Sequence, residues 1–450
     1  MDLIDKINKL KKEKNAIILT HCYQNVEIDE VSDYVGDSLF LSEKAAMTDA
    51  DIILFAGVYF MAQSAKLLSP NKKVLLPEIN SGCMMADMIN VDNLKSFKER
   101  YPNIPVVCYI NSTAEVKALC DVCCTSSNAI EVVKNLNSDK VLFVPDNFLG
   151  KYVQQQLPEI EIITFNGFCP IHQRIRLEEV EAARKNYPNA LILAHPECNQ
   201  EVAKNSDFIG STKEIMEYVI SSDARQFVIA TEKGVVDRLN RDSKKFNWGK
   251  EFILINENII CPDMKKNTLE GIYNTLLNES NEITIDDEVA KNAVKCIDKM
   301  FEITRAYDLK KVICPLCSHE MKKVFVDEIN ANIDVCEECG GVFFDYGEFE
   351  HIEFALENNT KCIDEIDSCE AKTPYKNVFV DNLTCPSCQS KMVKIEKRGT
   401  TILECEACLS KISVLPQIKE YRQKYIDDEV FINSVVNDSE IIDALDLLFG

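Results

Sequence analysis

Apolar residues in the first 265 positions occur in short runs rich in Ile, Val and Leu, separated by longer polar and mixed stretches. Continuous apolar runs of this length are typical of strands that are buried on both faces of a parallel sheet. Nine such runs begin at Ile17, Ile52, Val74, Val106, Val141, Ile162, Leu191, Phe227 and Phe252. Between them, segments such as 177–187 and 214–221 have the composition of helices. The pattern predicts alternating strands and helices, hence an α/β fold.

The nine predicted strands form a repeat. Corresponding runs in successive groups of three are offset by about 85 to 90 residues, which indicates a tandem architecture. We expect three similar α/β units, at residues 1–90, 91–175 and 176–305, the last of which includes the closing helices.

One lone cysteine follows the third predicted strand of each unit: Cys83, Cys169 and Cys261. Ligands of parallel sheets bind beyond the carboxyl ends of the strands, so a pseudo-threefold arrangement of the units would bring these three thiols to one centre. The alternative is three separate buried cysteines that act as small apolar residues. Their recurrence at the same place favours the shared centre.

Three thiolates can hold a zinc ion, or a 4Fe-4S cluster in which one iron lacks a protein ligand. An open iron would act as a Lewis acid in the dehydration or condensation of a small anionic substrate.

Small hydroxyl residues stand at a predicted helix start in each unit: Ser38, then Ser126 with Ser127, then Ser211 with Thr212. Ser and Thr are common N-caps, and Ser211 with Glu214 fits a capping box. Three helix N-termini that face one centre would also form an anion pocket, because their unpaired N–H groups carry partial positive charge.

Polar residues end the first strand of each unit: His21 and Tyr23, Tyr109 and Asn111, His195 and Glu197. His172 follows Cys169, so three of the five histidines of the chain lie in these loops. Histidine transfers protons near neutral pH, and carboxyl and phenol groups can assist.

The motifs THCYQ, GDSLFLS, PEINSGCMMADM, DVCCTSSNA, GFCPIH, AHPEC and CPDMKKNTLE together resemble the quinolinate synthase family over roughly residues 1–305. The resemblance implies three α/β/α sandwich domains around a pseudo-threefold axis. It implies a transferase of de novo NAD biosynthesis that condenses iminoaspartate with dihydroxyacetone phosphate to quinolinate, with loss of phosphate and water. It also implies functional coupling to L-aspartate oxidase or aspartate dehydrogenase.

The same resemblance implies site residues. Cys83, Cys169 and Cys261 would hold a 4Fe-4S cluster. The candidates for proton transfer are His21, Tyr23, His195 and Glu197. The candidates for substrate binding are His21, Ser38, Tyr109, Asn111, Ser126, His172, His195, Glu197, Ser211 and Thr212. The remaining cluster of Cys120, Cys123 and Cys124 has no equivalent in the other units and is interpreted as structural.

Two pairs of CxxC motifs predict two zinc ribbons, because four thiolates around Zn²⁺ stabilise a fold that is too small for its own core. The ligands would be Cys314, Cys317, Cys336 and Cys339 at the first site, and Cys385, Cys388, Cys405 and Cys408 at the second. We expect ribbons at 306–358 and 385–418, a linker at 359–384 and an acidic helical tail at 419–450. The first ribbon resembles the zinc-finger family of transcription factor IIB. Both sites are interpreted as structural, since four cysteines leave no open position on zinc.

Composition narrows the function classes. The chain has 20 cysteines, no apolar run near the length of a membrane helix and no signal-peptide pattern, so we expect a cytoplasmic protein whose cysteines bind metals. The net charge is −23, and residues 301–450 carry 16 basic against 29 acidic residues, which argues against nucleic-acid binding. A protein partner of the ribbons is therefore favoured. The alternative to an enzyme is a metabolite sensor whose ribbons signal to a transcription partner.

Overall fold

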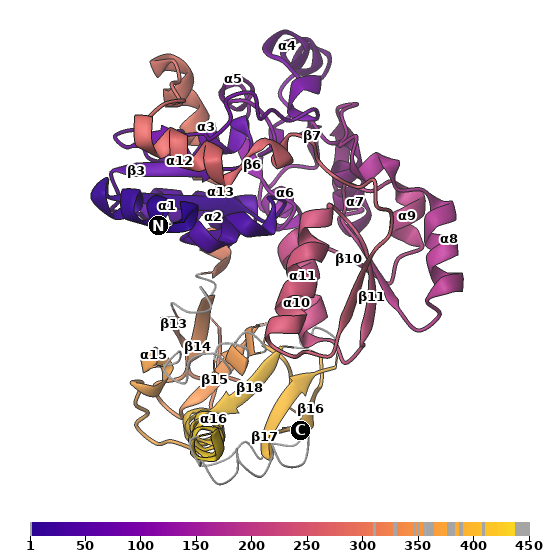
Figure 1. Cartoon of the computed structure of the whole chain (residues 1–450). Helices are drawn as coiled ribbons and strands as arrows, with labels where there is room; N and C mark the ends of the chain where they lie inside the picture. The colour runs from indigo at the N-terminus through magenta and orange to yellow at the C-terminus, as the bar shows by residue number, and fades with distance from the viewer. Residues whose placement is uncertain are drawn as a thin grey trace. The chain divides into compact units, whose positions relative to one another are not determined.

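The chain forms two compact units, Met1–Arg305 and Ala306–Gly450, here called the core and the C-terminal region (Figure 1). In this computed structural model the described residues are 2–308, 312–326, 331–345, 348–349, 352–353, 356, 364–375, 383–386, 390–406 and 410–436. Among them, no helix combines the length and the apolar character that a membrane crossing requires.

The core contains three parallel sheets of the same topology, and all nine predicted strands are present in them. These strands are β1 (Ala16–His21), β3 (Ile52–Ala56), β4 (Lys73–Leu75), β5 (Val106–Tyr109), β7 (Lys140–Val144), β8 (Glu161–Thr164), β9 (Leu191–Ala194), β11 (Gln226–Ala230) and β12 (Glu251–Leu254). The sheet orders are β2-β1-β3-β4, β6-β5-β7-β8 and β10-β9-β11-β12, so the internal repeat and the α/β fold are confirmed.

Each sheet has a fourth strand that the apolar pattern does not predict. These edge strands are β2 (Tyr34–Gly36), β6 (Val122–Cys124) and β10 (Phe208–Ile209). The apolar runs therefore account for three of the four strands of each sheet. Two or three residues are too few to show a periodicity, and these strands form only because they pair with β1, β5 and β9.

Helices cover both faces of the sheets. In β3 the successive residues Ile53 and Leu54 point to opposite faces, and both are fully buried. The helices of the repeat are α1 (Leu3–Glu13), α2 (Ser38–Met47), α3 (Tyr59–Leu68), α4 (Val91–Arg100), α5 (Ala114–Lys117), α6 (Ala129–Lys134), α7 (Asn147–Gln156), α8 (Leu177–Asn186), α9 (Gln200–Lys204), α10 (Thr212–Ser221) and α11 (Lys233–Lys245). The helices predicted at 177–187 and 214–221 are α8 and α10.

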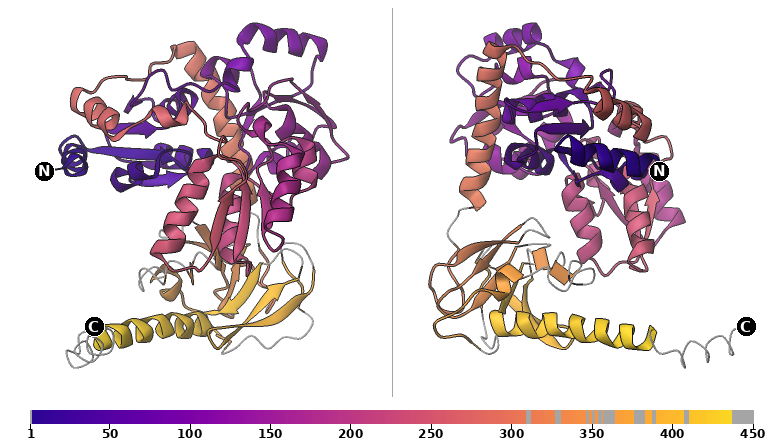
Figure 2. Two further views of the ribbon diagram at one scale, coloured as in Figure 1. Left: turned by 45° about the vertical axis from the view of Figure 1, so that its right-hand side comes forward. Right: turned by 60° about the vertical axis from the view of Figure 1, so that its left-hand side comes forward.

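The closing helices α12 (Leu269–Asn278) and α13 (Asp287–Asp308) do not pack on the third sheet, to whose unit the sequence assigned them. Ile272 and Leu276 of α12 join the cluster around α1 and β1, and Ile297 of α13 joins the cluster of the first two units. In the right-hand view of Figure 2, α13 is the long salmon-coloured helix. The chain thus returns to its beginning, and its closing helices pack on the first two units.

The C-terminal region is built on one six-stranded antiparallel sheet. Its order is β13 (Lys322–Val326), β14 (Ala331–Val335), β15 (Gly341–Phe344), β18 (Lys411–Val414), β17 (Thr400–Cys405) and β16 (Met392–Lys397). The first three strands come from the first predicted ribbon and the other three from the second. Because β15 pairs with β18 from Gly341↔Val414 to Phe344↔Lys411, the two ribbons share one sheet.

The segments after the ribbons differ from the predicted boundaries. Helix α16 (Leu415–Val436) starts inside the range expected for the second ribbon, and the end of the predicted tail lies outside the described residues. In the predicted linker, helix α15 (Asp364–Asp367) is followed by a segment whose N–H groups bond to the first ribbon: Thr373 donates to Glu338 O at 2.9 Å and Tyr375 to Cys339 O at 2.9 Å. The described part of this linker is therefore an ordered addition to the ribbon.

Candidate functional site

A cavity lies where the three units of the core meet, and the space between atoms there, including the part open to solvent, is about 770 Å³. All but one of the predicted site residues of the core line it. They are His21, Tyr23, Ser38, Cys83, Tyr109, Asn111, Ser126, Cys169, His172, His195, Glu197, Thr212 and Cys261. Each unit contributes one of the three cysteines, so loops that are far apart in the sequence converge on one site.

The three cysteine loops have the same backbone geometry. A short 3₁₀ helix starts three residues after each cysteine, at Ala86, His172 and Met264. In each loop the carbonyl of the cysteine accepts the N–H of the residue four positions later, at 3.0, 3.1 and 3.2 Å for Cys83, Cys169 and Cys261. The repeat of the sequence is therefore a repeat of the loops that present sulfur to the cavity.

Burial raises the pKa of the three thiols, to about 12 for Cys83 and about 11 for Cys261. Backbone N–H groups oppose this effect at each sulfur; at Cys83 they belong to Ala86 and Met85. Without a metal these cysteines are neutral thiols, whereas a bound metal ion would replace their protons. Hydrogen bonds from N–H groups to sulfur are also what stabilises the charge of an iron-sulfur cluster.

The donor set fits a cluster better than a single ion shared by the three cysteines. The core group compact enough for one ion, with ligand atoms within 4.8 Å of one another, is Cys169, His172 and Glu197, and it includes neither Cys83 nor Cys261. A cluster binds each thiolate through a different iron and so needs sulfurs that surround a larger space. A cavity lined by three sulfurs from three loops meets that requirement.

The strand-end histidines of the first and third units are held in the same way. The N–H of Tyr23 donates to Nδ1 of His21 at 3.1 Å, and the N–H of Glu197 donates to Nδ1 of His195 at 3.3 Å. Burial lowers the pKa of both histidines to about 3. Both rings are therefore neutral at physiological pH and carry their proton on Nε2, which makes them hydrogen-bond donors.

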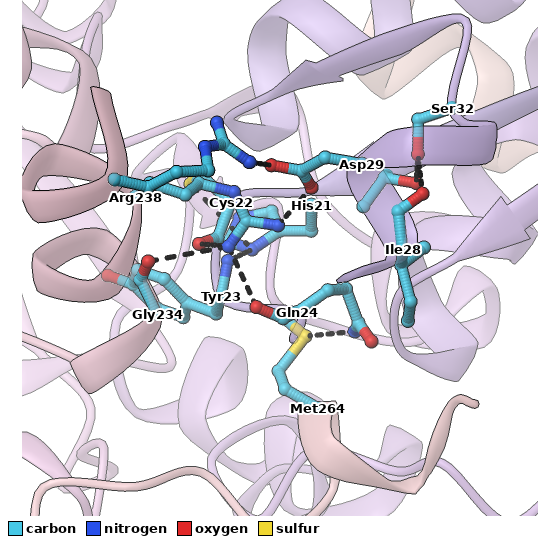
Figure 3. A network of polar contacts seen from close by, with 12 residues as sticks. His21, Cys22, Tyr23, Gln24, Ile28, Asp29, Ser32, Gly234, Arg238 and Met264 are labelled. Atoms are coloured by element: carbon cyan, nitrogen blue, oxygen red, sulfur yellow. Dashed lines mark hydrogen bonds and ion pairs between the residues drawn. The ribbon is translucent and has the colours of Figure 1, made fainter. Parts of the chain in front are cut away.

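Buried cations fix the loops that carry these side chains. Figure 3 shows the guanidinium of Arg238, from α11, among the carbonyls of the loop after β1. Its Nη1 donates to Cys22 O at 2.6 Å and Gln24 O at 2.7 Å, and Nη2 pairs with Asp29. Arg238 is 1% exposed. Helix α11 of the third unit thus holds the backbone that carries His21 and Tyr23 of the first unit.

The second unit uses a lysine at the corresponding place. Lys117 is fully buried, and its ammonium group donates to Ile110 O at 2.8 Å and to Ser112 O. These carbonyls follow Tyr109 by one and three residues, as those of Cys22 and Gln24 follow His21. The loop that bears Tyr109 and Asn111 is therefore fixed by the same kind of contact.

Glu197 is the charged centre of the cavity wall. Its Oε1 accepts the hydroxyl of Tyr109 at 2.6 Å, and its Oε2 lies 2.8 Å from Nδ1 of His172. Burial alone would raise its pKa, but the nearby His172 and the hydrogen bonds from His172 and Tyr109 outweigh burial and lower it. The carboxylate is ionised and can act as a base.

Of the predicted substrate-binding hydroxyl residues at the helix starts, all but Ser211 line the cavity. Ser38 is the first residue of α2, capped by Asp37, and Thr212 is the first residue of α10. Ser126 precedes α6, which begins three residues later than the sequence suggested, at Ala129. Ser211 does not line the cavity: its hydroxyl accepts the N–H of Glu214 at 3.2 Å in the predicted capping box. Its predicted contact with substrate has no support in this geometry.

The sequence did not single out Asp37, Thr125 and Glu232, which also line the cavity. Glu232 accepts the N–H of Cys261 at 3.1 Å and pairs with Lys265 at 3.3 Å. It follows the second strand of its unit, whereas the predicted site residues follow first and third strands. The amide oxygen of Asn111 is buried without a hydrogen-bond partner, which suits a donor on a bound ligand.

The cysteines predicted to be structural lie in the second unit, outside the cavity. Cys123 and Cys124 are fully buried in β6, and the sulfur of Cys123 lies 3.2 Å from that of Cys296 in α13. Cys120 donates to Val116 O at 3.2 Å. None of them lines the cavity, which agrees with a structural role.

The first ribbon brings its four predicted ligands together. The sulfurs of Cys314 and Cys339 are 3.6 Å apart and those of Cys317 and Cys336 are 3.4 Å apart, with all four within 4.8 Å of one another. Gly340 adopts φ +75° directly after Cys339, a conformation that costs glycine least. Four sulfurs in this arrangement could hold a metal ion.

The second ribbon repeats the turns of the first. The N–H of Cys314 and of Cys336 each bond to the carbonyl five residues later, and Cys385 and Cys405 do the same with Ser390 and Ser410, at 2.8 and 2.9 Å. Cys388 and Cys408 lie outside the described residues.

Comparison with known proteins agrees with the division of the chain into a core and a C-terminal region. The family described as quinolinate synthetase A protein matches residues 5–302, and the family described as transcription factor zinc-finger matches residues 313–353. A quinolinate synthase of Alkaliphilus metalliredigens (strain QYMF) is 55% identical over 302 residues, which are 98% of that protein and 67% of this chain. One of Caldicellulosiruptor saccharolyticus is 50% identical over 299 residues, 97% of that protein and 66% of this chain. The chain belongs to the quinolinate synthase family and carries a zinc-finger region after the family domain.

Proposed function

We propose that the core condenses iminoaspartate with dihydroxyacetone phosphate to quinolinate, with loss of phosphate and water, as a transferase of de novo NAD biosynthesis. The observation that carries the proposal is the convergence of three cysteines, an ionised glutamate and two neutral histidines on one cavity. The names of the relatives support the product. Both proposed substrates are anions, which suit a cavity reached by the starts of α2 and α10.

Cys83, Cys169 and Cys261 would hold a 4Fe-4S cluster, which supplies a Lewis acid when it is bound. Glu197 would accept a proton from substrate, because it is ionised and sits beside Cys169. His21 and His195 would donate hydrogen bonds to substrate oxygen through Nε2. Ser38, Ser126 and Thr212 would bind carboxylate or phosphate groups, Tyr109 would orient Glu197, and Asn111 would accept from substrate.

The test is anaerobic purification of the full chain, followed by iron, sulfide and zinc analysis and an assay for quinolinate. We expect about four irons per chain beyond the zinc of the ribbons. Cys83→Ser should remove activity and cluster iron while zinc content stays unchanged, since Cys83 belongs to the core alone. Cys369→Ser, outside the core and outside both predicted zinc sites, is the matched control.

Full turnover by Cys83→Ser would contradict the cluster assignment. Wild-type protein that contains no iron, makes no quinolinate and changes partner binding with a metabolite would support the sensor alternative instead. The ribbons would hold structural Zn²⁺ in both cases, so zinc content alone does not separate the two functions.

A further inference from the structure

The three cysteine loops are anchored by one repeated backbone contact. In each unit the N–H group of the first residue of the helix after β3, β7 or β11 bonds to the carbonyl two residues before the cysteine. The three pairs are Tyr59 with Ser81, Asn147 with Gly167, and Lys233 with Ile259, at 2.7, 2.8 and 2.9 Å. Of the three acceptor residues only Ser81 has a side chain that can form a further hydrogen bond.

The hydroxyl of Ser81 joins the loops of two different units. Ser81 is fully buried, and its Oγ lies 2.9 Å from Gly57 O and 2.9 Å from Asp263 O. Gly57 directly follows β3 of the first unit, whereas Asp263 stands two residues after Cys261 in the third unit. None of the three residues in these contacts lines the cavity. The hydroxyl therefore connects the loop of Cys83 with the loop of Cys261 from outside the cavity lining.

A buried amide determines which carbonyl receives the hydroxyl proton. Asn267 is fully buried, and its Nδ2 donates to Gly57 O at 2.8 Å. The carbonyl of Asp263 otherwise accepts only a longer bond among the described contacts, at 3.3 Å from the N–H of Lys266. A hydroxyl has one proton to donate, and here that proton is needed more at Asp263 than at Gly57. The bond from Ser81 to Asp263 is thus the one that crosses between the units.

The other described links from the loop of Cys83 to its neighbours are weaker. Lys266 donates to Asn80 O at 2.7 Å, but its side chain is 40% exposed, so water competes for this contact. The N–H of Phe168 reaches the sulfur of Met88 at 3.4 Å, and a thioether is a weak acceptor. The hydroxyl link is therefore the buried bond between two strong hydrogen-bonding groups.

Resting on the proposed function, we infer that Ser81 is a positioning residue whose hydroxyl holds Cys83 and Cys261 in the arrangement that the proposed cluster requires. A cluster that binds both thiolates needs loops of two units in a fixed relation. Loops that already have this relation bind more tightly, because less ordering accompanies binding. Ser81 acts through the two cysteines and touches neither substrate nor sulfur in the described contacts.

Replacing Ser81 by alanine tests the inference. Ser81→Ala removes the hydroxyl and leaves the carbonyl of Asp263 without its buried donor. The full chain is loaded with iron and sulfide without oxygen, and a chelator of ferrous iron is then added. We expect iron to leave the variant about fivefold faster than wild type, the ratio that corresponds to one net hydrogen bond. The zinc content should stay unchanged, because Ser81 belongs to the core.

Ser64→Ala is the matched control. Ser64 is 1% exposed, and its Oγ donates to Phe60 O at 2.9 Å within α3. This substitution removes the same kind of buried bond from the same unit without touching a link between loops. We expect it to lower the thermal unfolding temperature as much as Ser81→Ala does, and to leave the rate of iron release at the wild-type value.

Two results would overturn the inference while wild type holds its cluster. One is a wild-type rate of iron release from Ser81→Ala, and the other is an equal acceleration in Ser81→Ala and Ser64→Ala, which would indicate a general loss of stability. Wild-type protein that binds no iron would refute the proposed function, and the inference with it.

Discussion

At the scale of single residues, the strand-end histidine of the first unit makes stability depend on pH. Burial lowers the pKa of His21 to about 3, against 6.5 for the unfolded chain. Between these values the unfolded state binds a proton that the folded state does not, so stability is lost as pH falls below 6.5. We expect His21→Gln to lose less stability than wild type between pH 7 and 5.5, by about 1 kcal/mol.

Urea unfolding of the full chain at the two pH values measures this difference. His319→Gln is the control, because His319 is exposed and lies in the C-terminal region, outside the core. An identical pH dependence in wild type and His21→Gln would show that His21 is not held neutral.

Site residues could be predicted from the sequence where they occupy equivalent positions in the three repeats. Cys83, Cys169 and Cys261 each follow an apolar run, and all three reach the cavity. Arg238 carries no such signal. A buried arginine inside an ordinary helix acquires its role only from the carbonyls of a loop more than 200 positions away, as the contact with Gln24 shows.

At the scale of elements, the contact of α11 with the loop after β1 should control activity. Arg238→Met would leave the carbonyls of Cys22 and Gln24 without their buried donor, so the loop that bears His21 would shift. Because a displacement of about 1 Å can cost about a hundredfold in rate, we expect a loss of that order in kcat/KM with the cluster retained. Steady-state kinetics together with iron analysis would measure it.

The matched control is Arg241→Met. Arg241 pairs with the same Asp29, at 2.6 Å, but its side chain is 40% exposed and none of its described contacts is to a loop carbonyl. Equal effects of the two substitutions would indicate that Asp29, and not the loop, is what matters.

Strands could be predicted from the sequence where their apolar run was long enough to be recognised. The nine longer strands of the core were predicted, but β2, β6 and β10 depend on a neighbouring strand for their formation. Tertiary packing likewise placed α12 beside α1, since an apolar helix face does not specify which sheet it will cover. In the C-terminal region, spacing predicted two ribbons, but their fusion through β15 and β18 depends on a pairing that no local signal encodes.

At the scale of the whole molecule, the chain consists of a core with its own hydrophobic clusters and a C-terminal region with another set. The hydrophobic clusters of the C-terminal region form around its shared sheet and contain cysteines of both ribbons. This region therefore has a hydrophobic core of its own, as a domain does. All the cavity residues belong to the core, whose last residue, Arg305, lies in the final turn of α13. The chemistry proposed here therefore requires no side chain from the ribbons.

Truncation after Asp308 tests this separation. We expect the shortened chain to fold, to bind its cluster and to make quinolinate with kcat/KM within about threefold of the full chain, because a domain with its own core keeps its structure alone. Iron content and circular dichroism would establish that it is folded before activity is compared. A folded, cluster-loaded truncation with a much lower kcat/KM would instead show that the C-terminal region acts on the core, and adding that region in trans would determine whether the effect requires covalent attachment.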